Sequence, residues 1–186
     1  EYQAIQLFKE AGMSTPGGEV ATELAAGLTI ANRIGYPVVL KSQVLVGGRG
    51  KAGGIKVVKN ELEFHEHFNR IKALKIKGYS VEKIFIVPAI NIKKEFYAAV
   101  AIDNIKGDVV LIASAEGGVE IEETAKTNPQ AIKKYYLQGE KTIDPTRWPA
   151  FIQSIFPDVN DQKAATDFLQ KLITVFFNQD CSLAEI

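Results

Sequence analysis

The chain has few of the features that mark secreted, membrane-spanning or nucleic-acid-binding proteins. It contains a single cysteine, Cys181, which excludes an internal disulfide framework and favours a reducing compartment. It has no apolar run long enough to cross a bilayer. Its 22 Lys and Arg residues equal its 22 Asp and Glu residues, so no overall field attracts nucleic acid or an anionic membrane. Any basic site must therefore be local.

The sequence also lacks the residues from which familiar catalytic centres are built. Its only histidines, His65 and His67, lie in a polar segment that we expect to be helical, where both rings face solvent on different sides. Cys181 has no histidine near it in the sequence, so we expect it to pack in the core. The kinase signatures HRD and DFG are absent. The chain therefore offers no convincing nucleophile.

Glycine is concentrated in one stretch, VLVGGRGKAGGIKVV, at residues 44–58, where five of the eight residues from Gly47 to Gly54 are glycine. A Walker A loop is excluded because Ala52 follows Lys51 in place of Ser or Thr. The pattern G-x-G-x-x-G is present, but a dinucleotide site needs a helix directly after it, and the β-branched run IKVVK predicts a strand. A strand, a glycine loop and a second strand are typical of a flap that closes over phosphates.

Lys41 adds positive charge next to this loop. It stands in the apolar run PVVLK, where a lysine is costly unless it faces solvent or an anion. With Arg49, Lys51 and Lys56 it predicts a local cationic cluster, for which phosphate is the natural partner. The alternative is a solvated Lys41 beside a long hairpin turn. We favour the phosphate site, because a hairpin turn needs only one or two glycines.

Helical and strand patterns alternate along the chain, and two pairs of neighbouring strands look like hairpins, which predicts an α+β fold with largely antiparallel sheets. Helices are expected at residues 1–12, 19–34, 61–74, 118–126 and 161–179. Strands are expected at residues 38–46, 55–59, 83–87, 95–103, 109–115 and 182–186. The four prolines within 129–160 predict a loop with short helices, and we expect Trp148 and the pair Phe176–Phe177 in the core.

Five strings in order along the whole chain carry a resemblance to a known family: EYQAIQLFKEAG, PVVLKSQVLVGGRGKAGGIKVV, KKEFY, ASAEGGVEIEETA and SLAEI. The sequence resembles the ATP-grasp part of the β subunit of succinyl-CoA synthetase (succinate–CoA ligase) and of related acid–thiol ligases such as malate–CoA ligase. The resemblance implies an ATP-grasp domain over residues 1–186, truncated at its C-terminal end. It implies one α+β subdomain at 16–90 with the flap, a second at 1–15 plus 91–186, and the nucleotide site between them.

The resemblance also implies roles for particular residues. Lys41 matches the lysine that contacts the nucleotide phosphates, and Glu95 matches the glutamate that holds the ribose hydroxyls. Glu185 matches a catalytic glutamate that approaches the phosphohistidine of the partner subunit. The remaining nucleotide-binding positions are the flap and the two ends of the adenine hinge: Gly48, Arg49, Gly50, Val87 and Ile90.

In such ligases a nucleoside triphosphate phosphorylates a histidine of the α subunit, and the phosphate then passes to the acid, giving an acyl phosphate that CoA attacks. The partner implied is thus an α subunit that carries the phosphohistidine and the CoA site. The cofactors implied are ATP or GTP and Mg²⁺. The Mg²⁺ ligands are expected beyond Ile186, so none is assigned within the chain, and we expect this piece alone to be inactive. The resemblance places the protein in the cytoplasm, or in the mitochondrial matrix of a eukaryote.

One departure keeps an alternative open. Val87 stands where these ligases usually carry an acidic residue, and a valine side chain cannot accept a hydrogen bond from the amino group of a base. A non-catalytic nucleotide-binding or interaction module therefore stays possible. The acid substrate and the choice between ATP and GTP are also open at this point.

Overall fold

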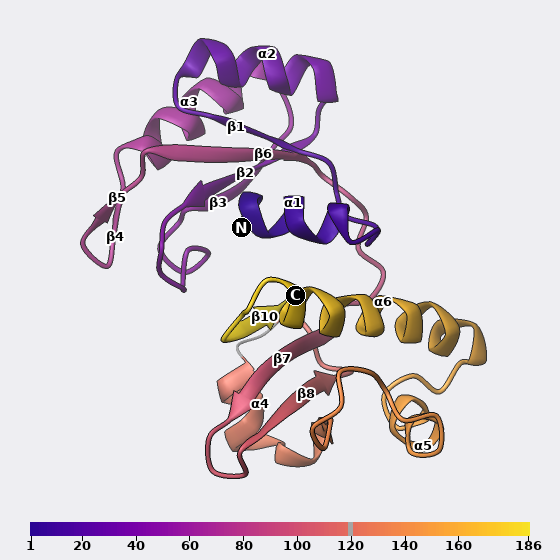
Figure 1. Ribbon diagram of the computed structural model, residues 1–186. Helices are drawn as coiled ribbons and strands as arrows, with labels where there is room; N and C mark the ends of the chain where they lie inside the picture. Colours follow the sequence, from indigo (N-terminus) through magenta and orange to yellow (C-terminus); the bar gives the residue numbers. More distant parts are fainter. Residues whose placement is uncertain (119–120) are drawn as a thin grey trace. The chain divides into compact units, whose positions relative to one another are not determined.

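The computed structural model describes residues 1–118 and 121–186, and these divide into two compact units (Figure 1). Unit 1 comprises Glu1–Gln6 and Ser14–Asn91, and unit 2 comprises Leu7–Met13 and Ile92–Ile186. The first helix, α1 (Tyr2–Glu10), has residues in both. The domain and subdomain limits expected from the sequence stay predictions, and each unit is described below by itself.

Unit 1 is a four-stranded antiparallel sheet with helices on one face. The strand order is β1 (Glu19–Ala21), β6 (Lys83–Pro88), β2 (Val38–Gln43) and β3 (Ile55–Val58). The two helices that pack on the sheet are α2 (Leu24–Ile34) and α3 (Glu61–Lys72) (Figure 1). A two-residue turn joins the short strands β4 (Lys75–Ile76) and β5 (Tyr79–Ser80) into a hairpin.

Buried side chains that alternate with partly exposed ones along β2, together with aromatic residues on α3, form the core of unit 1. Val38 and Leu40 are fully buried in the same cluster as Phe64 and Phe68, whose stacked rings lie 5.6 Å apart. Gly27 lets α2 approach this pair closely, since a Cβ atom there would lie 2.9 Å from the Phe68 ring. Because successive side chains of a strand point to opposite faces, burial of Leu40 against the helices turns its neighbours to the other face.

Unit 2 is a second antiparallel sheet, packed against the longest helix. Its order is β10 (Leu183–Glu185), β7 (Tyr97–Asp103), β8 (Asp108–Ser114) and β9 (Ile132–Tyr136). The helix α6 (Val159–Asn178) contacts β7 and β10. The shorter helical elements are α4 (Ile121–Thr127), η1 (Pro129–Ala131) and α5 (Trp148–Gln153).

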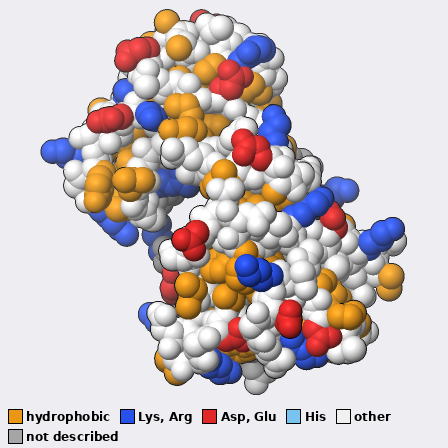
Figure 2. Space-filling model, in the orientation of Figure 1, with side chains coloured by type: hydrophobic (Ala, Val, Ile, Leu, Met, Phe, Trp, Pro, Cys, Tyr) orange, Lys and Arg blue, Asp and Glu red, His pale blue; other side chains and the backbone are white. Residues whose placement is uncertain are grey.

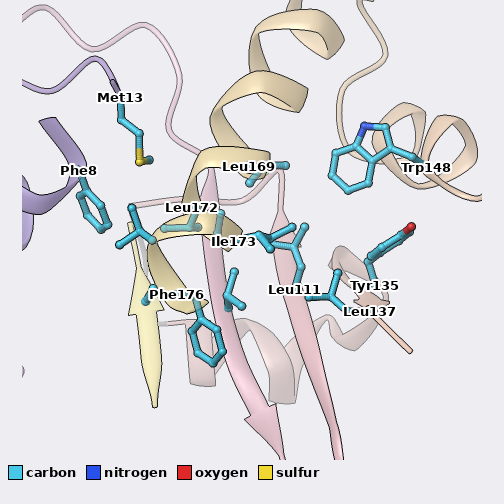
Figure 3. Close-up of a cluster of buried hydrophobic side chains, with 14 of the residues drawn as sticks. Phe8, Met13, Leu111, Tyr135, Leu137, Trp148, Leu169, Leu172, Ile173 and Phe176 are labelled. Atoms are coloured by element: carbon cyan, nitrogen blue, oxygen red, sulfur yellow. The ribbon is translucent and has the colours of Figure 1, made fainter. Parts of the chain in front are cut away.

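Aromatic and aliphatic side chains fill the core of unit 2 (Figure 3). Trp148 is buried with Tyr135 edge-on to it, and its indole Nε1 donates to Thr166 Oγ1 at 2.9 Å. Phe176 is buried and Phe177 is partly buried against the same cluster. The core roles expected for Trp148 and these two phenylalanines are confirmed, and Cys181 also packs against the cluster.

The α+β class with antiparallel sheets is confirmed, but two segments differ from expectation. Residues 19–34 are not all helical: Glu19–Ala21 form the edge strand β1, which pairs Val20 with Phe85, and the helix begins at Leu24. The stretch 129–160 contains the strand β9, which the prolines bracket and do not interrupt.

Smaller differences concern boundaries. The strand expected at 38–46 ends at Gln43, and part of the helix expected at 118–126 falls on residues 119–120, outside the described residues. The side chain of His65 is 45% exposed, but the Nδ1 atom of His67 is buried, so only His65 is open to solvent to the extent expected. Acidic and basic side chains are interspersed on the face that Figure 2 shows. Within residues 1–118 and 121–186, no helix combines the length and apolar character needed to cross a membrane.

Candidate functional site

Lys41 lies on the face of the unit 1 sheet that α2 and α3 leave uncovered. Its cross-strand partners are Ile55 on β3 and Phe85 on β6, and directly opposite residues point to the same side of a sheet. By the same register, Val87 and Val39 share this face with Lys41. The lysine expected at the phosphates and the residue expected at the base therefore stand on one sheet face, on adjacent strands.

The strand register shows that one residue of the predicted cationic cluster, Lys56, does not belong to it. Lys56 pairs with Leu40, whose side chain is buried against the helices, so Lys56 points to the opposite face from Lys41. The pattern of charge along the sequence could not show this, because Lys56 and Lys41 belong to different strands. A shared contact with Glu1 brings Lys41 and Arg49 together.

The glycine loop between β2 and β3 is folded into tight turns. The backbone N–H groups of Ala52, Gly53 and Gly54 donate to carbonyls within the loop at 2.8–3.1 Å. Gly48 and Gly53 have φ of +84° and +75°, the left-handed region that favours glycine. At Gly54 a side chain would collide with Ser42.

The other two glycines of the loop have no such structural reason. A Cβ atom on Gly47 would meet nothing within 4 Å, and one on Gly50 would only touch Ile55 at 4.0 Å. Both glycines are exposed. An exposed glycine without a packing partner suits a close approach by a ligand to the backbone, which is what a phosphate-binding loop requires.

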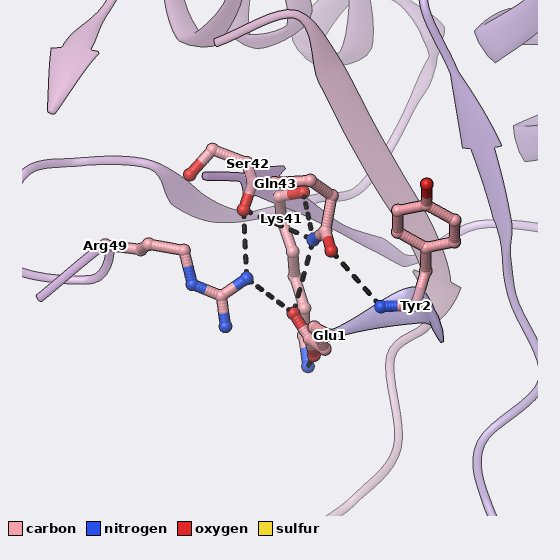
Figure 4. A network of polar contacts seen from close by, with 6 residues as sticks. All are labelled: Glu1, Tyr2, Lys41, Ser42, Gln43 and Arg49. Atoms are coloured by element: carbon pink, nitrogen blue, oxygen red, sulfur yellow. Dashed lines mark hydrogen bonds and ion pairs between the residues drawn. The ribbon is translucent and has the colours of Figure 1, made fainter. Parts of the chain in front are cut away.

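A carboxylate that the sequence did not flag joins the two cations (Figure 4). Glu1 Oε1 accepts from Lys41 Nζ at 2.8 Å, and Glu1 Oε2 accepts from Arg49 Nη1 at 2.7 Å. Arg49 Nη1 also donates to the Ser42 carbonyl at 2.9 Å. Gln43 donates to Glu1 at 3.3 Å and accepts from the backbone N–H of Tyr2 at 3.2 Å. The start of α1 is thereby fastened to the end of β2.

The positive charges of Lys41 and Arg49 keep the carboxyl group of Glu1 ionised. Burial alone would raise the pKa of its carboxyl, but hydrogen bonds and charges from Lys41 and Arg49 outweigh burial and lower the pKa below its ordinary value. The carboxylate is therefore charged at neutral pH. Together the three side chains carry one net positive charge, which still suits an anionic ligand.

The predicted adenine hinge, residues 87–90, comprises the last two residues of β6 and the two residues that follow it. The side chain of Val87 is buried, and a Cβ atom on Gly18 would lie 2.6 Å from its Cγ1, so the segment before β1 covers it. Ile90 is 63% exposed. Ala89 donates its backbone N–H to the Pro37 carbonyl at 3.0 Å. A ligand that reached this segment would find backbone groups and an apolar side chain at Ile90, and not the side chain of Val87.

In unit 2, Glu95 lies against the glycines of the EGGVE string. The Gly117 backbone N–H donates to the Glu95 carbonyl at 3.2 Å, and a Cβ atom on Gly117 would lie 2.5 Å from the Glu95 backbone. Gly118 has φ of +73°, and its Cα faces the Glu95 carboxylate so closely that a side chain would overlap it. The missing side chains of the glycine pair therefore let Glu95 lie against it, and Glu95 itself is exposed.

Glu185, the predicted catalytic residue, is exposed on the edge strand β10, opposite Ala99 of β7. A tyrosine to which the sequence patterns assign no role, Tyr97, lies near Glu185. Burial, with added effects from the charges of Glu185 and Glu122, raises the pKa of Tyr97 to about 12. Tyr97 is thus a neutral hydroxyl beside two carboxylates at neutral pH.

Among the residues that the structure describes, no three His, Cys, Asp or Glu side chains gather as a metal site would require. The donors in unit 1 are of another kind: two cations with N–H groups and a glycine loop. This set fits phosphate oxygens.

A family model described as "ATP-grasp domain" matches residues 1–186. The chain belongs to the ATP-grasp family. The antiparallel sheets and the glycine loop between β2 and β3 are thus those of an ATP-grasp domain, as the resemblance implied.

Within this family, the chain is similar to β subunits of succinate–CoA ligases. The β subunit of the ADP-forming succinate–CoA ligase from Chloroflexus aurantiacus is 42% identical over 189 residues, which cover 100% of this chain and 49% of the relative. The β subunit of the GDP-forming succinate–CoA ligase from Thermus thermophilus is 38% identical, again over 100% of this ATP-grasp chain and 49% of its own length. The chain spans about half the length of these relatives.

Solved structures support the fold. A Pyrococcus horikoshii protein superposes with a TM-score of 0.76 at 23% identity, covering 96% of this ATP-grasp chain and 77% of that one. A dinucleotide-forming acetyl-coenzyme A synthetase from Ca. Korarchaeum cryptofilum superposes with a TM-score of 0.74 at 17% identity, covering 98% and 82%. At these identities the likeness concerns the fold alone.

Proposed function

We propose that this chain is the nucleotide-binding part of the β subunit of an acid–CoA ligase of the succinate–CoA ligase type. The observation that carries the proposal is the pair Lys41 and Arg49 beside a glycine loop, in a chain that matches an ATP-grasp model over its whole length. The relatives from Chloroflexus aurantiacus and Thermus thermophilus supply the reaction class.

In this proposal Lys41 and Arg49 hold phosphate oxygens, and Gly48 and Gly50 let the loop backbone come close to them. The carboxylate of Glu95 accepts hydrogen bonds from the ribose hydroxyls, and it can lie close to Gly118 because this residue has no side chain. The segment from Val87 to Ile90 borders the base.

The nucleotide, when bound, supplies the phosphoryl group that is transferred to a histidine of an α subunit. In the proposal, Glu185 is the residue that orients the groups that meet in this transfer, and its charge contributes to the raised pKa of Tyr97. Mg²⁺ accompanies the nucleotide, and its protein ligands are not assigned to this chain. The relatives include ADP-forming and GDP-forming ligases, so both nucleotides belong in the test.

Binding of Mg-ATP and Mg-GTP, measured by calorimetry, tests the nucleotide site. Lys41→Ala should weaken binding by about a hundredfold, the loss of a charge-assisted contact to a phosphate. Lys56→Ala is the matched control, because it removes the same charge from the adjacent strand on the opposite sheet face. Equal losses in both variants, or none in either, would rule out the site on the face of Lys41.

The ligase activity needs a separate experiment. The full-length β subunit, co-expressed with its α subunit, should form acyl-CoA from a dicarboxylic acid, CoA and a nucleoside triphosphate. A stable α–β complex that binds ATP but turns over none of the acids tested would favour a non-catalytic module.

A further inference from the structure

Glu1 has no role in the function proposed above, yet its carboxylate touches both cations on which that function depends. Each carboxylate oxygen serves one of them, Oε1 on Lys41 and Oε2 on Arg49 (Figure 4). The Glu1 side chain is only 19% exposed, which is low for a glutamate at the surface of a domain. The carboxylate is therefore held between the cations and is not a freely solvated charge.

The contact leaves both cations able to bind a further anion. A lysine ammonium has three N–H donors and an arginine guanidinium has five. The contacts with Glu1 and Ser42 engage one of the three guanidinium nitrogens of Arg49, Nη1, and the contact with Glu1 engages one donor of Lys41. Glu1 thus orients the two side chains without using up their donors.

The contact also anchors the glycine loop. Arg49 belongs to the loop, whereas its partner Glu1 directly precedes α1 and its partner Ser42 belongs to β2. Inside the loop, the Arg49 carbonyl accepts from the Gly54 backbone N–H at 2.8 Å. A loop with five glycines loses much conformational freedom when it is ordered, and an anchor that orders it beforehand removes that cost from ligand binding.

We propose that Glu1 is a positioning residue of the nucleotide site, which holds Lys41 and Arg49 in place for the phosphates and anchors the glycine loop through Arg49. The part that concerns phosphates rests on the proposed function; the part that concerns the loop does not. Glu1 also offsets the mutual repulsion of two cations that share one small volume. Its own repulsion of a phosphate is already compensated by the two charges that it contacts.

Hydrogen exchange of the ligand-free protein tests the anchor. In Glu1→Gln the amides of Ala52, Gly53 and Gly54 should exchange about tenfold faster, because the charged contact to Arg49 is lost. Glu66→Gln, an exposed glutamate on α3 of the same unit, should leave these amides at the wild-type rate. In an Arg49→Ala background Glu1→Gln should add no further effect, since the partner is gone. Unchanged exchange in Glu1→Gln would overturn the anchor.

Ligand titration tests the positioning. Glu1→Gln should bind Mg-ATP about tenfold more weakly than wild type but adenosine equally well, because adenosine has no phosphates for Lys41 and Arg49 to hold. Glu1→Asp keeps the charge and should restore part of the ATP affinity. Unchanged ATP affinity in Glu1→Gln would overturn the proposal, and so would tighter binding, which would make Glu1 a competitor of the phosphates. If the wild-type protein binds no nucleotide, the proposed function fails, and the exchange experiment still decides whether Glu1 anchors the loop.

Discussion

The contact between Gly118 and Glu95 shows how a single residue position can serve a site without carrying any chemistry. Gly118 combines a left-handed backbone with a close approach to the Glu95 carboxylate. Gly139 has a similar backbone, with φ of +80°, but a Cβ atom there would meet nothing within 4 Å. A side chain at Gly139 would therefore introduce backbone strain alone, whereas a side chain at Gly118 would introduce the same strain and also disturb the contact with Glu95.

Substitution of either glycine by alanine should cost about 1–2 kcal/mol of unfolding free energy, the penalty for a side chain in the left-handed region. Only Gly118→Ala should also displace the Glu95 carboxylate, and it should lower the affinity for Mg-ATP by about tenfold. Urea denaturation and calorimetry on both variants measure the two effects. An equal loss of affinity in Gly139→Ala would contradict the assignment of Glu95 to the nucleotide site.

The local sequence was enough to predict Lys41, Arg49 and the loop glycines as site residues, because each is unusual among its sequence neighbours. It could not mark Glu1, since a glutamate at the start of a polar segment is ordinary until the fold places it against residues 40 and 48 positions away. Tyr97 was missed for the same reason: its raised pKa comes first from burial and then from the charges of Glu185 and Glu122, which are distant in the sequence. Contacts of this kind depend on tertiary packing and leave no periodic signal.

At the level of elements, the segment before α5 is held by one aspartate. Asp144 accepts from both the hydroxyl and the backbone N–H of Thr146 at 2.7 Å and from Arg147 Nε at 3.0 Å. These hydrogen bonds, those from Thr146 first, hold the pKa of Asp144 well below its ordinary value. The backbone N–H of Asp144 also donates to the Tyr135 hydroxyl at 2.8 Å, which ties this turn to β9.

A carboxyl whose pKa is lower in the folded state stabilises the fold above its unfolded pKa and loses that effect as the pH falls towards the folded value. Asp144→Asn should therefore unfold more easily than wild type at neutral pH, and the difference should shrink between about pH 5 and about pH 2. Denaturant titrations across this range measure it. Asp180→Asn is the control, because Asp180 is exposed and its left-handed backbone suits asparagine equally well. If the difference in unfolding free energy between wild type and Asp144→Asn stays constant with pH, the charge of Asp144 does not stabilise the fold.

Elements with strong periodicity were predicted well, whereas the strands β1 and β9 were missed. The helix expected at 161–179 is α6 at Val159–Asn178, and the hairpin expected at 95–115 is β7 and β8. The strand β1 has three residues and reaches its structure only by pairing with β6, so its local sequence resembled the start of the next helix. Strand β9 stood in a stretch whose prolines suggested a loop, although no proline falls within it.

At the scale of the whole molecule, the balance of charge limits what the protein can attract. Equal numbers of acidic and basic residues leave the cluster of Lys41 and Arg49 as a local feature on a neutral background. A small polyanion that fits the cluster should bind, whereas an extended polyanion is not attracted by any overall positive charge. Specific and non-specific binding of phosphate-rich ligands can therefore be told apart.

Thermal unfolding makes this distinction measurable. A ligand that binds only the folded state stabilises it by about 2.7 kcal/mol at a free concentration of a hundred times its Kd, so Mg-ATP at that concentration should raise the Tm. In Lys41→Ala the same concentration should give a much smaller rise, while Lys56→Ala should behave like wild type. Single-stranded RNA at an equal concentration of phosphate groups should leave the Tm unchanged, because stabilisation requires the local site and not negative charge in general. A rise with RNA as large as that with ATP would mean that the protein binds polyanions through a wider surface than the face of Lys41.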